Sequence, residues 1–302
     1  MASIDMIITR PVLNIIASYV KRTIKKRRKF FPPYSAHRCF LDVAYMDDKK
    51  NGHRYDIYLS KSHRKNVCII DIHGGSYMFS ESTDNYPFAN EFLKNGYDVV
   101  CVDYVPNNGK RDTLDLIKDC VSCINHLIDN LDKYGLDKDS FVISGDSAGG
   151  HFALLISEAI LNKEVAEKLG LDIRPIKING ILVNGPVYDF ELMLDGSMSN
   201  GALNRMFGKG HHFLEHMREL SPRTYVESIT VPLFVSTCTN DFIRTHSVVL
   251  KHDYEKMNKD LVFVDIESDE PNVDHVHNVV KPNLLESRVV NLKMMEFIDN
   301  LF

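Results

Sequence analysis

A serine flanked by glycines at a predicted strand-to-helix turn is the feature that most constrains this chain. Residues 145–150 read Gly-Asp-Ser-Ala-Gly-Gly and directly follow the apolar run Phe-Val-Ile-Ser at 141–144. In this setting the pattern G-x-S-x-G is typical of a nucleophile elbow, a sharp turn that lifts the hydroxyl of its serine clear of a sheet. Side chains at Gly145 and Gly149 would clash in such a turn. The sequence therefore predicts Ser147 as a nucleophile, with a helix after it whose positive end faces a developing oxyanion.

A second glycine-rich loop lies earlier in the chain. The run Val-Cys-Ile-Ile-Asp-Ile at 67–72 predicts a buried central strand, and His-Gly-Gly-Ser follows at 73–76. In hydrolases with this kind of elbow, N–H groups of such a loop and the N–H after the nucleophile hold the oxyanion. The expected donors are Gly74, Gly75 and Ala148. The alternative is that both glycine-rich segments are turns with a structural role only.

At this point the chain resembles the hormone-sensitive-lipase-like branch of the α/β-hydrolases, which contains carboxylesterases and lipases. The resemblance rests on His-Gly-Gly followed later by Gly-Asp-Ser-Ala-Gly-Gly, and it covers most of residues 40–302. Further positions fall in family-like order: Asp103-Tyr104, Ser221-Pro222, Pro232 and Asp241. The resemblance implies a hydrolase that needs no cofactor and acts on small-molecule esters.

The chain departs from the family pattern at two places. Ser76 stands where the oxyanion loop usually has a third glycine, which leaves Gly74 and Gly75 in place. Val-Pro-Asn-Asn at 105–108 replaces the Pro-Glu segment that usually follows the Asp-Tyr pair. Because of the second departure, the family pattern does not indicate which residues form the wall of the acyl pocket.

The acid of a triad should follow the serine in the chain and precede the histidine. The run 231–236 predicts a strand, and the loop after it ends at Asp241, which matches the family's acid position. Such an acid holds the imidazole in one tautomer and stabilises the imidazolium. The alternatives are Asp189, which follows the predicted strand at 181–184, and a purely loop-capping role for Asp241.

The base should follow one more strand, predicted over 261–266. Two histidines lie beyond it, His275 and His277. The family often has His, any residue, then an aromatic residue, and His275 fits that register. We therefore expect His275 to be the base and His277 to be a pocket-wall or surface residue.

Alternation of strand-like and helix-like runs predicts the fold class. The first two strands, near 40–45 and 54–59, are separated by Asn51-Gly52 and predict a hairpin. Strands and helices then alternate to the end of the chain. The expected architecture is α/β: an α/β-hydrolase fold with a mainly parallel eight-stranded sheet, flanking helices and a small helical cap.

Two segments interrupt this alternation. Residues 1–38 have apolar positions at helical spacing and a basic stretch at 21–29. We expect a cap segment here, with contact of residues 1–30 to an anionic membrane surface as the alternative. Residues 187–228 are rich in Met, Phe and Gly and predict a cap insertion. The hydrolase core is then expected over 39–186 and 229–302.

Composition narrows the classes of partner. The chain has 302 residues, a net charge of −5 and six cysteines. The charge gives no support to nucleic-acid binding. We expect free thiols, no secretory signal and a cytoplasmic location. Neither Cys120-x-x-Cys123 nor the His212/His216 pair has the further ligands of a metal site. A homodimer is compatible with these observations.

The sequence thus predicts a serine carboxylesterase that hydrolyses short- to medium-chain esters through an acyl-enzyme. An acyl-peptide or amide hydrolase on the same triad is the first alternative. A non-catalytic ligand-binding member of the fold is the second, and the presence of both Ser147 and a downstream histidine argues against it.

Overall fold

The computed structural model describes residues 35–302 except 49–51, 62, 108–110 and 196–212. The basic stretch and most of the predicted N-terminal cap segment therefore lie outside the described residues. The strand β1 begins at Ala36, within the last residues of the predicted N-terminal segment 1–38. Among the described residues, no helix combines the length and apolar composition that a membrane crossing requires.

Eight strands form one sheet, in the order β1-β2-β4-β3-β5-β6-β7-β8. The first two pairings, β1 with β2 and β2 with β4, are antiparallel, and all the others are parallel. The strands are β1 Ala36–Ala44, β2 Arg54–Ser60, β3 Cys68–Ile72, β4 Asp98–Val102, β5 Phe141–Asp146, β6 Ile178–Asn184, β7 Leu233–Cys238 and β8 Leu261–Ile266. This confirms the predicted eight-stranded, mainly parallel sheet and the antiparallel pairing of its first two strands.

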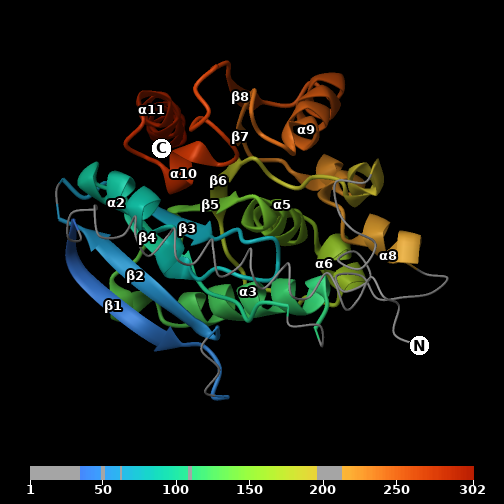
Figure 1. Ribbon diagram of the computed structural model, residues 1–302. Coiled ribbons are helices and arrows are strands. Elements are labelled where there is room, and N and C mark those ends of the chain that lie inside the picture. The colour runs from blue at the N-terminus through green and yellow to red at the C-terminus, as the bar shows by residue number, and fades with distance from the viewer. Residues whose placement is uncertain (1–34, 49–51, 62, 108–110, 196–212) are drawn as a thin grey trace.

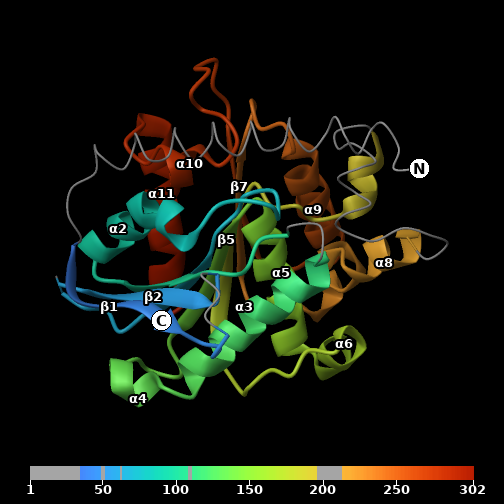
Figure 2. The same ribbon diagram turned by 60° about the horizontal axis from the view of Figure 1, so that its bottom comes forward.

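Helices cover both faces of the sheet (Figures 1 and 2). The α-helices are α2 Tyr86–Lys94, α3 Thr113–Ile128, α4 Leu131–Tyr134, α5 Ala148–Leu161, α6 Lys163–Leu169, α8 Phe213–Glu219, α9 Arg244–Lys256, α10 His277–Val280 and α11 Leu285–Asp299. Short 3₁₀ helices are η1 Ser82–Asp84, η2 Phe190–Asp195, η3 Pro222–Thr224 and η4 Val226–Ser228. Buried side chains of α2 and α11 pack on one face, and those of α3, α5 and α9 pack on the other.

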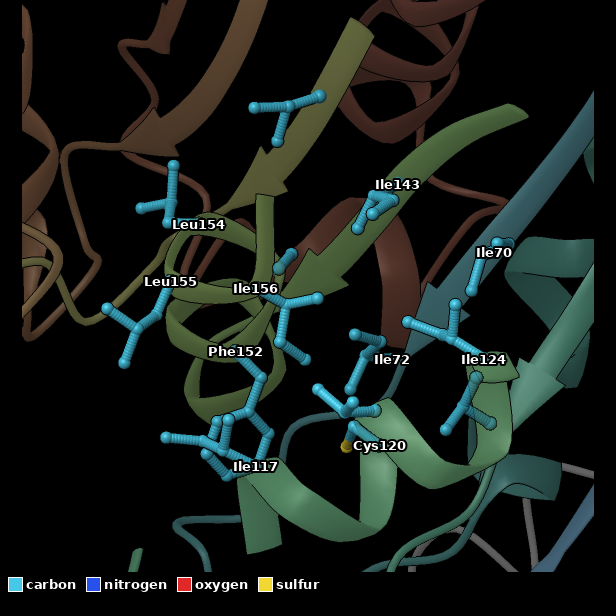
Figure 3. Close-up of a cluster of buried hydrophobic side chains, with 14 of the residues drawn as sticks. Ile70, Ile72, Ile117, Cys120, Ile124, Ile143, Phe152, Leu154, Leu155 and Ile156 are labelled. Atoms are coloured by element: carbon cyan, nitrogen blue, oxygen red, sulfur yellow. The ribbon is translucent and has the colours of Figure 1, made fainter. Parts of the chain in front are cut away.

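The central strands have buried side chains on both faces of the sheet, and each face packs against one of the two helix layers. Within β3, Ile70 packs toward α3 and α5, whereas Ile69 packs toward α2. Figure 3 shows the first layer, where isoleucines of β3 and β5 meet α3 and α5. Because every position of these strands loses contact with water, they are continuous apolar runs instead of alternating ones. Truncation of a core residue such as Ile143 to Ala costs about 2–5 kcal/mol in cores of this kind.

The segment between β6 and β7 differs in part from the predicted cap insertion at 187–228. Met217, Leu220, Tyr225 and Val226 are buried in the main hydrophobic cluster, and η3 and η4 pack against α5. The second half of this segment is therefore part of the core, because its apolar side chains cover the outer surface of α5. Residues 196–212, at the centre of the predicted cap, lie outside the described residues.

Candidate active site

Ser147 occupies a strained turn between β5 and α5. Its backbone angles are φ 53° and ψ −117°, a conformation that non-glycine residues rarely adopt. A Cβ at Gly149 would lie 1.9 Å from the Ile72 carbonyl oxygen, and one at Gly145 would lie 2.2 Å from the Gly149 oxygen. The predicted clash at both glycines is confirmed. Close approach of α5 to β3 and β5 holds the serine at the end of the sheet.

The imidazole of His275 lies between Ser147 and Asp241. His275 Nε2 is 2.9 Å from Ser147 Oγ, and His275 Nδ1 is 2.8 Å from Asp241 Oδ1. Because a carboxylate can only accept, the Nδ1–H donates to Asp241 and Nε2 is left to accept the serine proton. These three residues come from the turn after β5, the loop after β7 and the loop after β8. The carboxyl ends of these parallel strands meet at one edge of the sheet.

The surroundings of Asp241 favour its charged form. Burial opposes ionisation, but hydrogen bonds from His275, Ile243 and Thr237 favour the carboxylate and outweigh it. The Ile243 N–H donates to Asp241 Oδ1 at 2.9 Å, and the Thr237 hydroxyl donates to Oδ2 at 3.1 Å. Together these contacts hold the pKa of the Asp241 carboxyl below its usual range. The carboxylate is therefore ready to orient an imidazole.

The two alternative residues from the sequence do not join this arrangement. Asp189 Oδ2 accepts from Arg223 Nη1 at 3.1 Å, and its Oδ1 accepts from the Glu191 N–H. His277 is buried and its Nδ1 lies 2.9 Å from the Ser287 hydroxyl of α11. Burial lowers the pKa of His277 to about 4. Both side chains have structural partners elsewhere.

One predicted oxyanion donor needs correction. The N–H of Gly74 donates to Asp146 Oδ1 at 3.0 Å, so it is already engaged. A Cβ at Gly74 would lie 2.5 Å from Asp146 Oδ2 and 3.1 Å from Ser147 Cβ, which explains why glycine is needed there. Within the described part of the chain, the N–H groups of Gly75 and Ala148 have no hydrogen-bond partner. These two donors therefore remain from the predicted set.

Two buried carboxyl groups lie behind the loop, and the sequence prediction missed them. Asn85 Nδ2 donates to Asp71 Oδ2 at 2.9 Å and to Asp146 Oδ1 at 2.8 Å. Burial, and then the charge of Asp146, raise the pKa of Asp71 to about 6, and burial also raises the pKa of Asp146. An acidic residue inside an apolar strand run was the available signal, because such groups are buried only with partners.

An exposed aromatic ring borders the histidine. Phe242 follows Asp241 and is 75% exposed. Its ring lies edge-on to the His275 imidazole, with 4.6 Å between the ring centroids. A large apolar side chain is thus available at the surface next to the Ser147–His275 contact.

Cys120 and Cys123, which were weighed for metal binding, lie on a helix that contributes no residue to the proposed triad. Cys120 and Cys123 are free, buried thiols within α3. His212 lies outside the described residues. The described residues hold no group of three or more His, Cys, Asp or Glu side chains that could bind a metal ion.

Solved esterase structures share this fold. The chain superposes on esterase B from Lactobacillus rhamnosis with a TM-score of 0.88 at 20% identity, covering 100% of this chain and 96% of that one. A bacterial heroin esterase gives a TM-score of 0.70 at 15% identity, covering 96% and 92%. The architecture is that of an esterase-type α/β-hydrolase. The pattern of the BD-FAE family matches residues 55–253. This chain belongs to the BD-FAE family, an esterase family of the α/β-hydrolases.

Curated relatives are plant methylesterases. A probable isoprenylcysteine alpha-carbonyl methylesterase of Arabidopsis thaliana is 25% identical over 200 residues, which are 66% of this chain and 40% of the relative. A corresponding protein of Oryza sativa subsp. japonica is 23% identical over 199 residues, 65% of this chain and 47% of the relative. The chain thus matches less than half the length of these relatives. The expected α/β-hydrolase carboxylesterase family is confirmed at the level of an esterase family.

Proposed function

We propose that this protein is a serine carboxylesterase with Ser147 as nucleophile, His275 as base and Asp241 as acid. The observation that carries the proposal is the position of His275, whose two ring nitrogens lie 2.9 Å from Ser147 Oγ and 2.8 Å from Asp241 Oδ1. A nucleophile, a base within hydrogen-bond reach and a group that orients the base are the parts that acyl transfer requires.

The reaction follows from these positions. His275 Nε2 takes the proton of the Ser147 hydroxyl while Oγ attacks the carbonyl carbon of the ester. The oxyanion of the tetrahedral intermediate accepts hydrogen bonds from the N–H groups of Gly75 and Ala148, next to the positive end of α5. The imidazolium then gives its proton to the alcohol oxygen as the C–O bond breaks. Water, activated by the same imidazole, hydrolyses the acyl-enzyme and releases the acid.

We propose esters of short- to medium-chain acids as the substrates. The predicted cap insertion at 187–228 is only about 40 residues long and its second half packs on α5, which makes it slight for a large lid. The solved esterase B was inhibited by a tributyrin phosphonate, a compound with short acyl groups. Both observations bear on the acyl group of the substrate and not on its alcohol.

The test is turnover of p-nitrophenyl esters from acetate to decanoate by the whole chain and by Ser147→Ala. We expect hydrolysis with a maximum at the shorter acyl groups and loss of turnover in the variant by several orders of magnitude. A p-nitroanilide with the same acyl group tests amide hydrolysis in parallel. Equal turnover by Ser147→Ala would overturn the proposed nucleophile, and a clear preference for the anilide would overturn the proposed bond type.

A further inference from the structure

We propose that Tyr104 and Asp146 are positioning residues that aim the N–H of Gly75 at the oxyanion of the reacting ester. This inference rests on the proposed function. It concerns two buried side chains that touch the oxyanion loop from different strands: Tyr104 follows β4 and Asp146 ends β5.

Tyr104 holds the carbonyl side of the loop. Its hydroxyl lies 3.1 Å from the His73 carbonyl oxygen and 3.0 Å from the Gly74 carbonyl oxygen, so it donates to this pair. The Tyr104 ring also stacks on the His73 imidazole, with centroids 4.3 Å apart and an interplanar angle of 13°. His73 Nδ1 lies 2.7 Å from the Gly74 carbonyl oxygen and so also holds this carbonyl, while His73 Nε2 lies 3.3 Å from Asp103 Oδ1. The two carbonyl groups therefore have one defined direction.

Asp146 holds the amide side of the same loop. Its Oδ1 accepts from the Gly74 N–H at 3.0 Å and from Asn85 Nδ2 at 2.8 Å. Asn85 is tied to Asp71, and the Ser144 hydroxyl donates to Asp71 at 3.0 Å. Asp146 is 5% exposed and directly precedes Ser147, so the loop and the nucleophile share one rigid support.

Peptide geometry converts these contacts into a direction for Gly75. The described residues contain no cis peptide bond, and in a trans peptide the C=O and the next N–H point in opposite directions. Because Tyr104 draws the carbonyls of His73 and Gly74 to one side, the N–H groups of Gly74 and Gly75 point to the other. Asp146 accepts a hydrogen bond from the Gly74 N–H, on the side of Ser147. The Gly75 N–H has no partner among the described residues and is left for an oxyanion.

The experiment compares Tyr104→Phe, Asp146→Ala and Asp146→Asn with the wild-type chain. Removal of one oxyanion donor costs about 10²–10³ in kcat, so we expect a misdirected donor to cost about tenfold or more, with KM changed less than about threefold. Affinity for a trifluoromethyl ketone, which forms a tetrahedral adduct with the serine, should fall by the same factor as kcat/KM. Asp146→Asn keeps an acceptor oxygen for the Gly74 N–H and should recover most of the kcat lost in Asp146→Ala.

Two matched variants separate positioning from stability. Tyr134→Phe removes another buried tyrosine hydroxyl, which contacts Tyr55 at 3.2 Å beside α4. Asn162→Ala removes two hydrogen bonds at the far end of α5, to Ser228 Oγ and from the Glu164 N–H. Both should lower the melting temperature and leave kcat and inhibitor affinity unchanged.

The outcomes are distinguishable. If the wild-type chain hydrolyses no ester, the proposed function is wrong and this inference falls with it. If the wild type is active and Tyr104→Phe retains wild-type kcat and inhibitor affinity, only the positioning role is overturned. Tyr104→Phe decides the matter alone if Asp146→Ala does not fold.

Discussion

Asn240 and Asp274 form an isolated parallel bridge between the loop that carries Asp241 and the loop that carries His275. Asn240 Nδ2 lies 3.1–3.4 Å from the carbonyl oxygens of Ser268, Glu270 and Val273, in the segment that leads to His275. The proposed acid and base are thus joined through the backbone as well as through their side chains.

Asn240→Ala is expected to lower kcat several-fold, because the two loops lose their tie and the imidazole loses part of its orientation. Loss of such bonds should cost about 1 kcal/mol of unfolding free energy. Urea unfolding and ester kinetics measure the two effects. Asn125→Ala removes hydrogen bonds to the loop at 172–174, which lies away from the site, and it should lower stability without lowering kcat. A fall in kcat of the same size in Asn125→Ala would contradict this account.

Gly149→Ala is expected to abolish folding or activity. The added Cβ would lie 1.9 Å from a backbone oxygen of β3, which cannot move without disturbing the sheet. Gly170→Ala is the matched control, because its φ is +61° but nothing lies within 4 Å of the new atom. The control should cost only about 1–2 kcal/mol, the strain of a left-handed residue. Soluble yield and thermal unfolding provide the comparison, and a Gly149→Ala protein as stable as the control would contradict the packing described.

His277 is expected to make stability depend on pH in mildly acid solution. Its pKa is lowered to about 4 in the folded state, whereas the unfolded histidine titrates near its ordinary value of 6.5. Between these values the unfolded chain binds more protons, so stability is lost as pH falls, by at most about 1.4 kcal/mol per pH unit. Replacement by Asn removes this titration. Urea midpoints from pH 7 to 4 should therefore fall less steeply for His277→Asn, and parallel curves would show that His277 does not contribute.

Phe242→Ala is expected to raise KM for esters of large apolar alcohols. The leaving alcohol must reach His275 Nε2 to take its proton, and the exposed Phe242 ring lies 4.6 Å from that imidazole. Acetates of methanol, butanol and 1-naphthol test the alcohol side, and p-nitrophenyl esters of graded acids test the acyl side. Leu285→Ala, at an equally exposed residue on α11, is the control. A change confined to the acyl series would contradict the expected contact.

Much of the fold and of the site could be predicted from the sequence because the relevant signals are local or ordered along the chain. Apolar runs marked the strands, and the glycines around Ser147 marked the turn. Asp241 and His275 each follow a predicted strand, in the order that the elbow requires. Parallel strands bring such loop residues to one edge of the sheet. Asp189 and His277 satisfy the same chain order, so the choice of Asp241 and His275 rested on the family's acid position and histidine register.

Contacts across strands could not be predicted in the same way. Gly74 was expected to face the substrate, but its N–H meets Asp146 because β3 and β5 pair with Ile72 opposite Gly145. The same register brings Asp71 opposite Ser144, and Asn85 reaches both carboxyls from the start of α2. No local sequence pattern specifies the register of β3 and β5 or the contact of Asn85 with both carboxyl groups. The packing of the second half of the segment at 187–228 on α5 is another contact that composition does not reveal.

Ser147 is the proposed nucleophile of the proposed ester hydrolysis. The most direct measurement is reaction of the whole chain with a fluorophosphonate, followed by mass spectrometry of its peptides. We predict one modified residue, Ser147, with labelling that stops ester hydrolysis in proportion to its extent and is absent in Ser147→Ala. Labelling of a different serine, or ester hydrolysis that persists after complete modification of Ser147, would show that Ser147 is not the nucleophile.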